Sequence, residues 1–505
     1  MKQFLLFLSL GIVLSLVLSS GQIENPDTHL RLTQTRLLLE TGHFGLPQDV
    51  GVDVHGNVAI NEEGQRQMVY NPGQTLLFVP IYSFSKLVAA DDADTYYTAA
   101  FLVSFLNYII HALSAFLLFK IALAIGSSLK NAVFLALLFA LTSYSFAFAQ
   151  CTYEHHYEMF FVLLAYYCVL DKGLKYGALY AGLAISAGII FRSTIVIAVP
   201  PLLFLQHQNK ERIQLLLTSG IGVIAIMYYN YYRFGHPLET GYSSAWQLAF
   251  GDHVTEFWSL ARAPKGIYGL LLSPGKGLLV FSPTILISLW GIKMFWKKHK
   301  RLTIAAGTLV IFYIGLFSMN FAWHGSVWSF GPRYILPIVP WLYLPVVELR
   351  MARKWKRGFI VAGMLSQVLL ISVNYKREVL DQFITLHQVE EEEYSFNFHN
   401  IPYLVQFEQL VKVFPKNIHH LRNYQPHAPW TRELRTGSGS DVLNNSIEKN
   451  AINFWWVRIF HWNTSMLAKS LLFFIVMGIV AIEVLFLRRT TVYHLKSNRP
   501  KSHLK

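Results

Sequence analysis

Charged residues and cysteines are both scarce in this sequence. Only 14% of its 505 residues are charged, whereas a large soluble enzyme carries roughly 25%. With 53% hydrophobic residues and a mean hydropathy of +0.37, this composition excludes an ordinary soluble enzyme. Cys151 lies at the outer end of one expected helix and Cys168 near the inner end of the next, about 25 Å apart, which excludes a disulfide between them. The main solvent of the chain is therefore lipid.

Long apolar runs predict an all-α, polytopic transmembrane helix bundle. The hydrocarbon core of a bilayer is about 30 Å thick and needs about 20 mostly apolar helical residues to cross it. About twelve spans are expected on this criterion: 3–19, 97–120, 131–150, 155–171, 176–191, 194–207, 213–230, 277–293, 302–319, 335–349, 358–374 and 466–487. The run 74–90, which contains Pro80 and Lys86, is expected to lie in the interface as an amphipathic helix.

Basic residues cluster on one side of these predicted spans. With the N-terminus inside, the clusters at 297–301 and 350–357 and the tail 488–505 all face the cytoplasm, as the positive-inside rule requires. These clusters explain much of the net charge of +14. No nucleic-acid-binding fold or basic amphipathic stripe accompanies them, so the lipid bilayer is an expected partner and nucleic acid is not.

The longer connecting segments gather on the opposite, outer face. The expected organisation is a transmembrane core at 1–374 that includes the first outer loop 20–73, an outer segment at 375–465, a last transmembrane helix at 466–487 and a basic cytoplasmic tail at 488–505. The first 20 residues suit either an uncleaved anchor or a cleaved signal peptide.

The first outer loop contains the sequence ENPDTHLRLTQTRLLLETGHFGLP at 24–47. Its leucines suit an interfacial amphipathic helix with Asp27 as the N-cap. Asp27 also lies about eight residues beyond the first span, where a lipid phosphate would lie. A carboxylate at this depth could take a proton from an acceptor hydroxyl, and Glu24 is close enough to be the alternative acid.

The second outer loop, CTYEHHYEMF at 151–160, brings ionisable residues to head-group depth. The apolar stretch 159–170 is too short to cross a bilayer, so its helix must include loop residues. Glu154, His155 and Glu158 are then costly to desolvate, which makes them site candidates. Glu154 and Glu158 share a helix face and could hold a divalent cation or form a solvated face; the metal is left unknown.

Five further segments follow in an order that resembles the C-type glycosyltransferase superfamily, which includes protein O-mannosyltransferases and aminoarabinose transferases. They are VYNPGQTLLFVPIYSF (69–84), GIIFRST (188–194), YYNYYRFGHPLETGY (228–242), LLSPGKGLLVFSP (271–283) and WHGSVWSFGPRYILPIVP (323–340). The resemblance covers residues 20 to about 345. It implies an inverting transfer of one sugar from a polyprenyl- or dolichyl-phosphate donor to a glycan, lipid or protein acceptor. It also implies a multi-pass protein of the bacterial inner membrane with its active site on the periplasmic face.

The resemblance also implies roles for individual residues. Asp27 would be the catalytic base and Glu154 a second catalytic acid. Arg192 and Arg333 would bind the donor phosphate, because a planar guanidinium makes bidentate, charge-assisted bonds to phosphate; snorkelling towards lipid head groups is the alternative. Residues that could contact the sugar or acceptor are His155, Tyr70, Tyr242, Trp323 and His324.

Two other functions remain open. An O-antigen ligase or polymerase also has many spans and a large outer segment, and it would depend on arginines such as Arg422 or Arg432 in place of Arg192 or Arg333. A secondary transporter would place charges near the bilayer midplane and show internal repeats. The predicted spans are nearly free of charge and no repeat is evident, which favours an enzyme.

Overall fold

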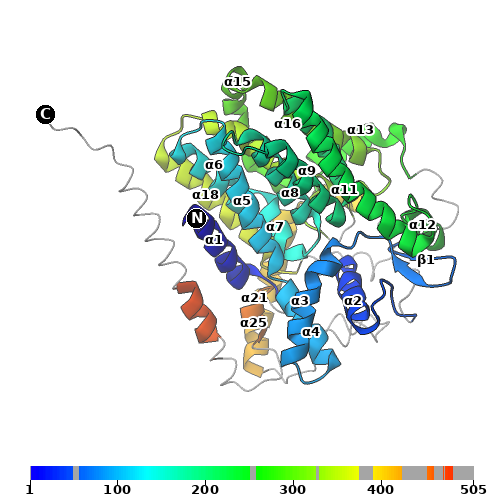
Figure 1. Cartoon of the computed structure of the whole chain (residues 1–505). Coiled ribbons are helices and arrows are strands. Elements are labelled where there is room, and N and C mark those ends of the chain that lie inside the picture. Colours follow the sequence, from blue (N-terminus) through cyan, green and yellow to red (C-terminus); the bar gives the residue numbers. More distant parts are fainter. Residues whose placement is uncertain are drawn as a thin grey trace.

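The fold is a bundle of helices with one small β-hairpin at its edge (Figure 1). The computed structural model describes residues 2–48, 56–250, 257–325, 329–374, 391–423, 452–459, 470 and 473–481. The predicted all-α class is confirmed over these residues, because the only named strands are β1 (Val58–Ile60) and β2 (Arg66–Met68).

The helices follow one another in this order: α1 (Lys2–Leu18), α2 (Pro26–Thr41), α3 (Gly73–Val88), α4 (Asp92–Val103), α5 (Leu106–Ala124), α6 (Leu129–Thr142), α7 (Tyr144–Phe148), η1 (Ala149–Cys151), α8 (His155–Leu170), α9 (Gly177–Phe191), η2 (Ser193–Ala198), α10 (Val199–Leu205), α11 (Asn209–Phe234), α12 (Tyr242–Phe250), η4 (Leu260–Arg262), α13 (Ala263–Leu272), α14 (Leu278–Phe281), η5 (Pro283–Ser288), α15 (Leu289–Lys298), α16 (Lys300–Ser318), η6 (Arg333–Ile338), α17 (Val339–Tyr343), η7 (Leu344–Glu348), α18 (Arg353–Ile371), α20 (Glu391–Phe396), η9 (Phe398–Asn400), α21 (Pro402–Asn423) and α25 (Trp455–Arg458).

Three of the described helices are long and apolar enough to cross a membrane: Asp94–Ala124, Asn209–Phe234 and Lys300–Ser318. A fourth is possible if the bent pair Leu129–Thr142 and Tyr144–Cys151, which turns by 52°, counts as one span. These helices indicate an integral membrane protein, but the predicted number of about twelve spans is not confirmed.

Prolines explain part of this difference. The predicted span 194–207 is divided between η2 and α10, where Pro200 and Pro201 occur. The predicted span 335–349 is divided into η6, α17 and η7, with Pro337 inside η6. Because proline has no backbone N–H and clashes with the preceding turn, an apolar run that contains it does not form one continuous α-helix.

The N-terminal helices α2, α3 and α4 pack together at the end of the bundle where α1 ends (Figure 1). The predicted helix at 74–90 is present as α3, with Pro80 inside it, and its position relative to a bilayer stays a prediction. The predicted span 97–120 begins earlier, as the 31-residue helix Asp94–Ala124. This arrangement gathers the first outer loop at one end of the bundle.

The outer segment predicted at 375–465 is described only at 391–423 and 452–459. It contributes α20, α21 and α25, and the backbone N–H of Trp455 in α25 donates to the carbonyl of Ser19 just after α1. Of the predicted last span 466–487, only residue 470 and residues 473–481 are described, and the tail 488–505 lies outside the described residues.

Candidate active site

The start of α2 places Asp27 at the edge of the bundle. Asn25, and not Asp27 as the sequence predicted, is the N-cap, because its side-chain oxygen accepts from the backbone N–H of Thr28 at 2.8 Å. Pro26 occupies the first turn, where its missing N–H is tolerated. The Asp27 carboxylate is therefore free of the capping role and available for other contacts.

The same turn ties the first outer loop to the second. The Asn25 amide donates to the carbonyl of Cys151 and, at 3.0 Å, to the hydroxyl of Thr152, while the Thr28 hydroxyl donates to the Thr152 carbonyl at 3.2 Å. Thr152 has a φ of +60°, a strained value for a β-branched residue. These contacts hold Asp27 next to the start of α8, where Glu154 lies.

Glu154 is buried between two arginines. Its carboxylate lies 2.9 Å from Arg31 Nη2 and 2.5 Å from Arg192 Nη1, and the Arg31 guanidinium stacks on the Tyr70 ring at 4.1 Å. Burial alone would raise the pKa of the Glu154 carboxyl, but the attraction of Arg31 and Arg192 lowers this pKa overall. Glu154 is therefore an ionised partner for both arginines.

Glu158, one turn further along α8, completes the contacts of Arg192. Its carboxylate lies 3.0 Å from Arg192 Nε and accepts from the hydroxyls of Thr194 at 2.6 Å and Tyr313 at 2.8 Å. Glu154 and Glu158 share one face of α8, as their spacing predicted, and both contact Arg192. A cation bound by these two carboxylates would compete with Arg192.

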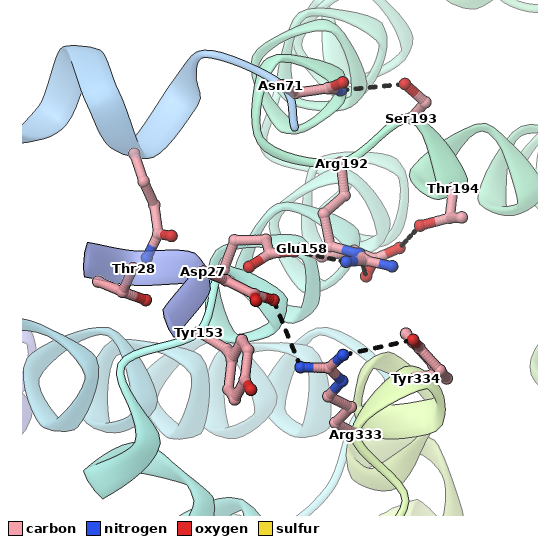
Figure 2. A network of polar contacts seen from close by, with 12 residues as sticks. Asp27, Thr28, Asn71, Tyr153, Glu158, Arg192, Ser193, Thr194, Arg333 and Tyr334 are labelled. Carbon is pink, nitrogen blue, oxygen red and sulfur yellow. Dashed lines mark hydrogen bonds and ion pairs between the residues drawn. The ribbon is translucent and has the colours of Figure 1, made fainter. Parts of the chain in front are cut away.

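Arg333, the first residue of η6, reaches Asp27 from the other side (Figure 2). Its Nη1 lies 3.5 Å from Asp27 Oδ2, and its guanidinium lies over the rings of Tyr153 and Tyr334. Nη2 donates to the Tyr334 hydroxyl at 3.4 Å. Neither Nε nor Nη1 has a hydrogen-bond acceptor among the described residues, so Arg333 retains donors for a ligand.

The six charged groups of this site balance one another. The acids Asp27, Glu154 and Glu158 are 6%, 3% and 0% exposed, and they contact the arginines Arg31, Arg192 and Arg333. Buried charges are tolerated when they are paired in this way. The hydrogen bonds and ion pairs join α2, α8, the end of α9 and η6 into one network (Figure 2).

A cavity of about 650 Å³ adjoins this network. Arg192 and Tyr334 form part of its wall, and its other lining residues are mostly aromatic or neutral polar: Thr194, Thr240, Tyr242, Ser243, Trp246, Gln247, Phe257, Trp258, Leu316, Phe317, Asn320 and Ala322. Its volume is in the range of small-molecule sites. Through Tyr334, the cavity wall connects to Arg333 and so to Asp27.

The predicted substrate-contacting residues lie in three places: on the cavity wall, inside the ionic network, and beside it. Tyr242 lines the cavity. Tyr70 and His155 are buried in the network, Tyr70 below Arg31 and His155 with its ring centroid 5.8 Å from that of Tyr334. Trp323 does not line the cavity; it is buried, and its indole N–H donates to Glu392 at 3.0 Å.

His324 lies beside Trp323 and is also buried. Burial lowers its pKa to about 3, and the nearby charges of Lys276 and Arg333 contribute to this shift. The imidazole is therefore neutral at physiological pH. Its proximity to Arg333 places it at the border of the network, away from the cavity wall.

Glu24, the alternative acid of the first outer loop, has a different environment from Asp27. Its carboxylate accepts from Gln22 at 2.7 Å and from Asn374, just after α18, at 3.1 Å. These contacts join the beginning of the first outer loop to the end of α18. The geometry therefore favours Asp27 over Glu24 as the acid next to Arg333.

Several residues of the site escaped the sequence analysis. Arg31 lies one helical turn after Asp27, a spacing that puts both residues on one face of α2, and this was a usable signal. Tyr313, Tyr334 and the cavity-wall aromatic residues other than Tyr242 gave none, because only the tertiary fold brings α12, α16 and η6 together. No group of three or more metal-ligating side chains occurs among the described residues.

Comparisons with known proteins find similarity among solved structures. No family model and no curated protein matches the chain. Among solved structures, ArnT from Cupriavidus metallidurans bound to undecaprenyl phosphate matches with a TM-score of 0.43 and 12% identity, over 84% of this chain and 81% of that one. A similarity at this level assigns no reaction to the present chain.

Proposed function

We propose that this protein is a membrane glycosyltransferase that moves one sugar from a polyprenyl-phosphate donor to a hydroxyl-bearing acceptor on the non-cytoplasmic face. The observation that carries the proposal is the contact between Asp27 and Arg333 at the border of a buried ionic network. A carboxylate that can accept a proton lies beside a guanidinium with unused donors, next to a cavity of suitable size.

In the proposed reaction, Asp27 takes the proton of the acceptor hydroxyl. The acceptor oxygen then forms a bond to the anomeric carbon, while the bond from that carbon to the phosphate oxygen breaks. The polyprenyl phosphate leaves with the bonding electron pair, and the sugar is transferred with inversion. Asp27 is suited to the proton transfer because, among the described residues, its carboxylate has two long polar contacts, to Arg333 at 3.5 Å and Asn57 at 3.3 Å.

The arginines would stabilise the leaving phosphate. Arg333 Nε has no hydrogen-bond acceptor in the part of the chain that the structure describes, and Arg192 forms part of the cavity wall while Glu154 and Glu158 hold its guanidinium in place. A donor fixed in advance beside a developing negative charge contributes about 3 to 4 kcal/mol to the transition state. Glu154 then acts as a positioning residue for Arg192 and Arg31, which differs from the catalytic role that the sequence suggested.

The aromatic side of the cavity could bind the parts of the donor other than its phosphate. Trp246, Phe257 and Trp258 offer apolar faces, and Tyr242 and Gln247 offer hydrogen-bonding groups. This mixture can bind a sugar ring or the first isoprene units of a lipid.

The positions of the charges argue against the transporter alternative. Glu154, Arg192 and Arg333 lie at the beginning or end of α8, α9 and η6, whereas a transporter places its charges near the bilayer midplane. The ligase alternative depends on Arg422, whose side chain is outside the described residues, and on Arg432, which is also outside them.

Mass spectrometry of lipid-linked sugars and surface glycans tests the proposal directly. Cells that lack the protein should accumulate one polyprenyl-phosphate monosaccharide and lose one sugar from a surface glycan, lipid or protein. Replacing Arg333 in the chromosomal copy should reproduce this phenotype, and replacing Arg432 should not. Unchanged lipids and glycans in the deletion strain would contradict sugar transfer, and a phenotype that follows Arg432 alone would favour the ligase alternative.

A further inference from the structure

Helix α21 has the reverse of the usual arrangement for a helix on a protein surface. Among its described side chains, the buried ones are mostly polar: Gln406, Gln409 and Asn417 are each 4% exposed, and Pro402 and Val413 are the buried apolar ones. Its outward side chains include five large apolar residues besides charged ones. A surface helix in water normally turns its apolar side inward, so the environment of this outward side is not expected to be water.

The outward apolar residues form one continuous stripe. They are Leu404, Phe407, Val411, Phe414 and Ile418, with exposed fractions of 61%, 59%, 58%, 53% and 39%. Their alternating spacing of three and four residues keeps them on one helix face. Beside this stripe, Glu408 and Lys412 form an ion pair of 2.6 Å on the exposed edge.

Hydrogen bonds fix both ends of α21 to helices that are expected to cross the membrane. At its first turn, the Tyr403 hydroxyl donates to the carbonyl of Phe281 at 3.0 Å and lies 3.4 Å from the Gln367 amide of α18. Near its other end, Asn417 accepts from the backbone N–H of Ile452, whose neighbour Asn453 donates to the carbonyl of Ser372, just after α18.

These contacts place α21 at one end of the bundle. The segment that carries Asn453 also binds the end of α1, since the Trp455 and Trp456 indoles donate to the carbonyls of Leu16 and Val17 at 2.8 Å. Figure 1 shows α21 beside α25 at this end. Tyr403 and Asn417 of α21 are thus attached near the level at which α1 and α18 end, which is where lipid head groups would meet these helices.

We infer that α21 lies in the plane of the membrane interface, with the stripe from Leu404 to Ile418 inserted among the lipids of the outer leaflet. Helix α21 packs against α18, which itself exposes the apolar residues Val361 and Leu365. Continuity with this expected lipid-facing surface favours lipid over a protein partner. The charged edge at Glu408 and Lys412 lies at the boundary with water, as in in-plane amphipathic helices.

This position gives the outer segment a role as a second membrane attachment close to the site. Glu392 of α20, which precedes α21, accepts from the Trp323 indole. The segment that leads into α21 is therefore hydrogen-bonded to the loop that precedes Arg333. The inference depends on membrane embedding and is independent of the proposed sugar transfer.

Site-directed fluorescence in proteoliposomes tests this placement. Single cysteines replace Val411 on the stripe or Lys412 on the charged edge of the full-length protein, and each is labelled with bimane; the native Cys151 and Cys168 are buried, and unlabelled-variant controls measure their background. Vesicles of phosphatidylethanolamine and phosphatidylglycerol contain either brominated lipids or none, and iodide is added as the aqueous quencher. Both variants are compared at the same labelling yield.

The two positions should respond in opposite ways. We expect brominated lipid to quench the label at Val411→Cys at least about twofold more than the label at Lys412→Cys, and iodide to show the reverse order. Equal iodide quenching at both positions would place the stripe in water and overturn the inference. A label at 411 that neither quencher reaches, together with cross-linked dimers or co-purified protein, would also overturn it, in favour of a protein partner.

Discussion

Arg333 Nη1 lies 3.5 Å from Asp27 Oδ2, and this contact joins the start of α2 to the start of η6. The distance is longer than a strong charge-assisted hydrogen bond, which is about 2.7 to 2.9 Å. The ion pair between Asp27 and Arg333 is therefore a long one, and each side chain can also contact a substrate. A proton acceptor and a phosphate ligand can both act from this arrangement.

Replacing Asp27 with Asn should remove the proposed base while keeping the side-chain shape. We expect sugar transfer to fall by about 10² to 10⁴-fold, with little change in donor binding. Turnover and donor affinity of purified protein in nanodiscs measure the two effects separately. Asp92→Asn, at an exposed position of α4, is the matched control and should leave turnover unchanged.

Replacing Arg333 with Lys keeps the charge but removes the planar fork that can hold a phosphate through two bonds. We expect turnover to fall by about 10² to 10³-fold because the leaving phosphate loses a fixed donor. Steady-state kinetics check this, with Arg212→Lys at an exposed position as the control. If the lysine variant matched the wild type in turnover, bidentate binding at Arg333 would be wrong.

Gly325 should be required for the position of Arg333. Its φ is +69°, and a Cβ added there would lie 2.7 Å from Arg333 Cγ. Gly325→Ala should therefore displace the arginine and lower turnover while the protein still folds. Gly307→Ala in α16, where nothing lies within 4 Å of an added Cβ, is the control. Equal activity of both variants would show that the arginine tolerates the displacement.

Replacing Glu154 with Gln should destabilise the protein, because Arg31 and Arg192 would lose the carboxylate that compensates them. Breaking a buried ion pair in this way costs about 3 to 5 kcal/mol. Because the pKa of Glu154 is lowered in the folded protein, this stabilisation is complete above the unfolded pKa and is lost as pH falls through the lowered value. Thermal unfolding in detergent, at neutral and acidic pH, measures the difference. A variant as stable as the wild type at neutral pH would contradict the proposed ion pairing.

His324 should make the protein less stable as the pH falls. Its folded-state pKa is lowered to about 3, so between its ordinary value and about 3 the unfolded chain binds a proton that the folded protein does not. The loss of stability from pH 7 towards pH 4 should thus be smaller in His324→Gln than in the wild type. The exposed His236→Gln is the control for the measurement. If the stability of His324→Gln and of the wild type fell equally between pH 7 and pH 4, a buried, neutral His324 would be contradicted.

The sequence predicted the helical class from its apolar runs. It also predicted residues that the fold brings together, because the acids of the two outer loops lie at helix starts and the arginines lie at the ends of apolar runs. Asp27, Glu154, Arg192 and Arg333 all belong to one network. The sequence did not reveal that Asn25 takes the capping role, since both residues are good N-caps and lie two positions apart.

Other features depend on tertiary contacts. Whether Trp323 would face the cavity or the interior is decided by its contact with Glu392, in a segment distant along the chain. The number of about twelve spans stays a prediction, because apolar composition does not report how proline divides a run into short helices. The outward apolar stripe of α21 is visible only when burial is known, since the spacing alone fits a buried face equally well.

The most direct test of the central claim is the amount of polyprenyl-phosphate monosaccharide in cells whose only copy of the protein is Asp27→Asn, measured by mass spectrometry beside the wild type and the deletion strain. The account predicts that the variant is present in the membrane at normal levels and accumulates the same lipid-linked sugar as the deletion strain. Accumulation in the deletion strain together with wild-type lipid levels in the Asp27→Asn strain would contradict it.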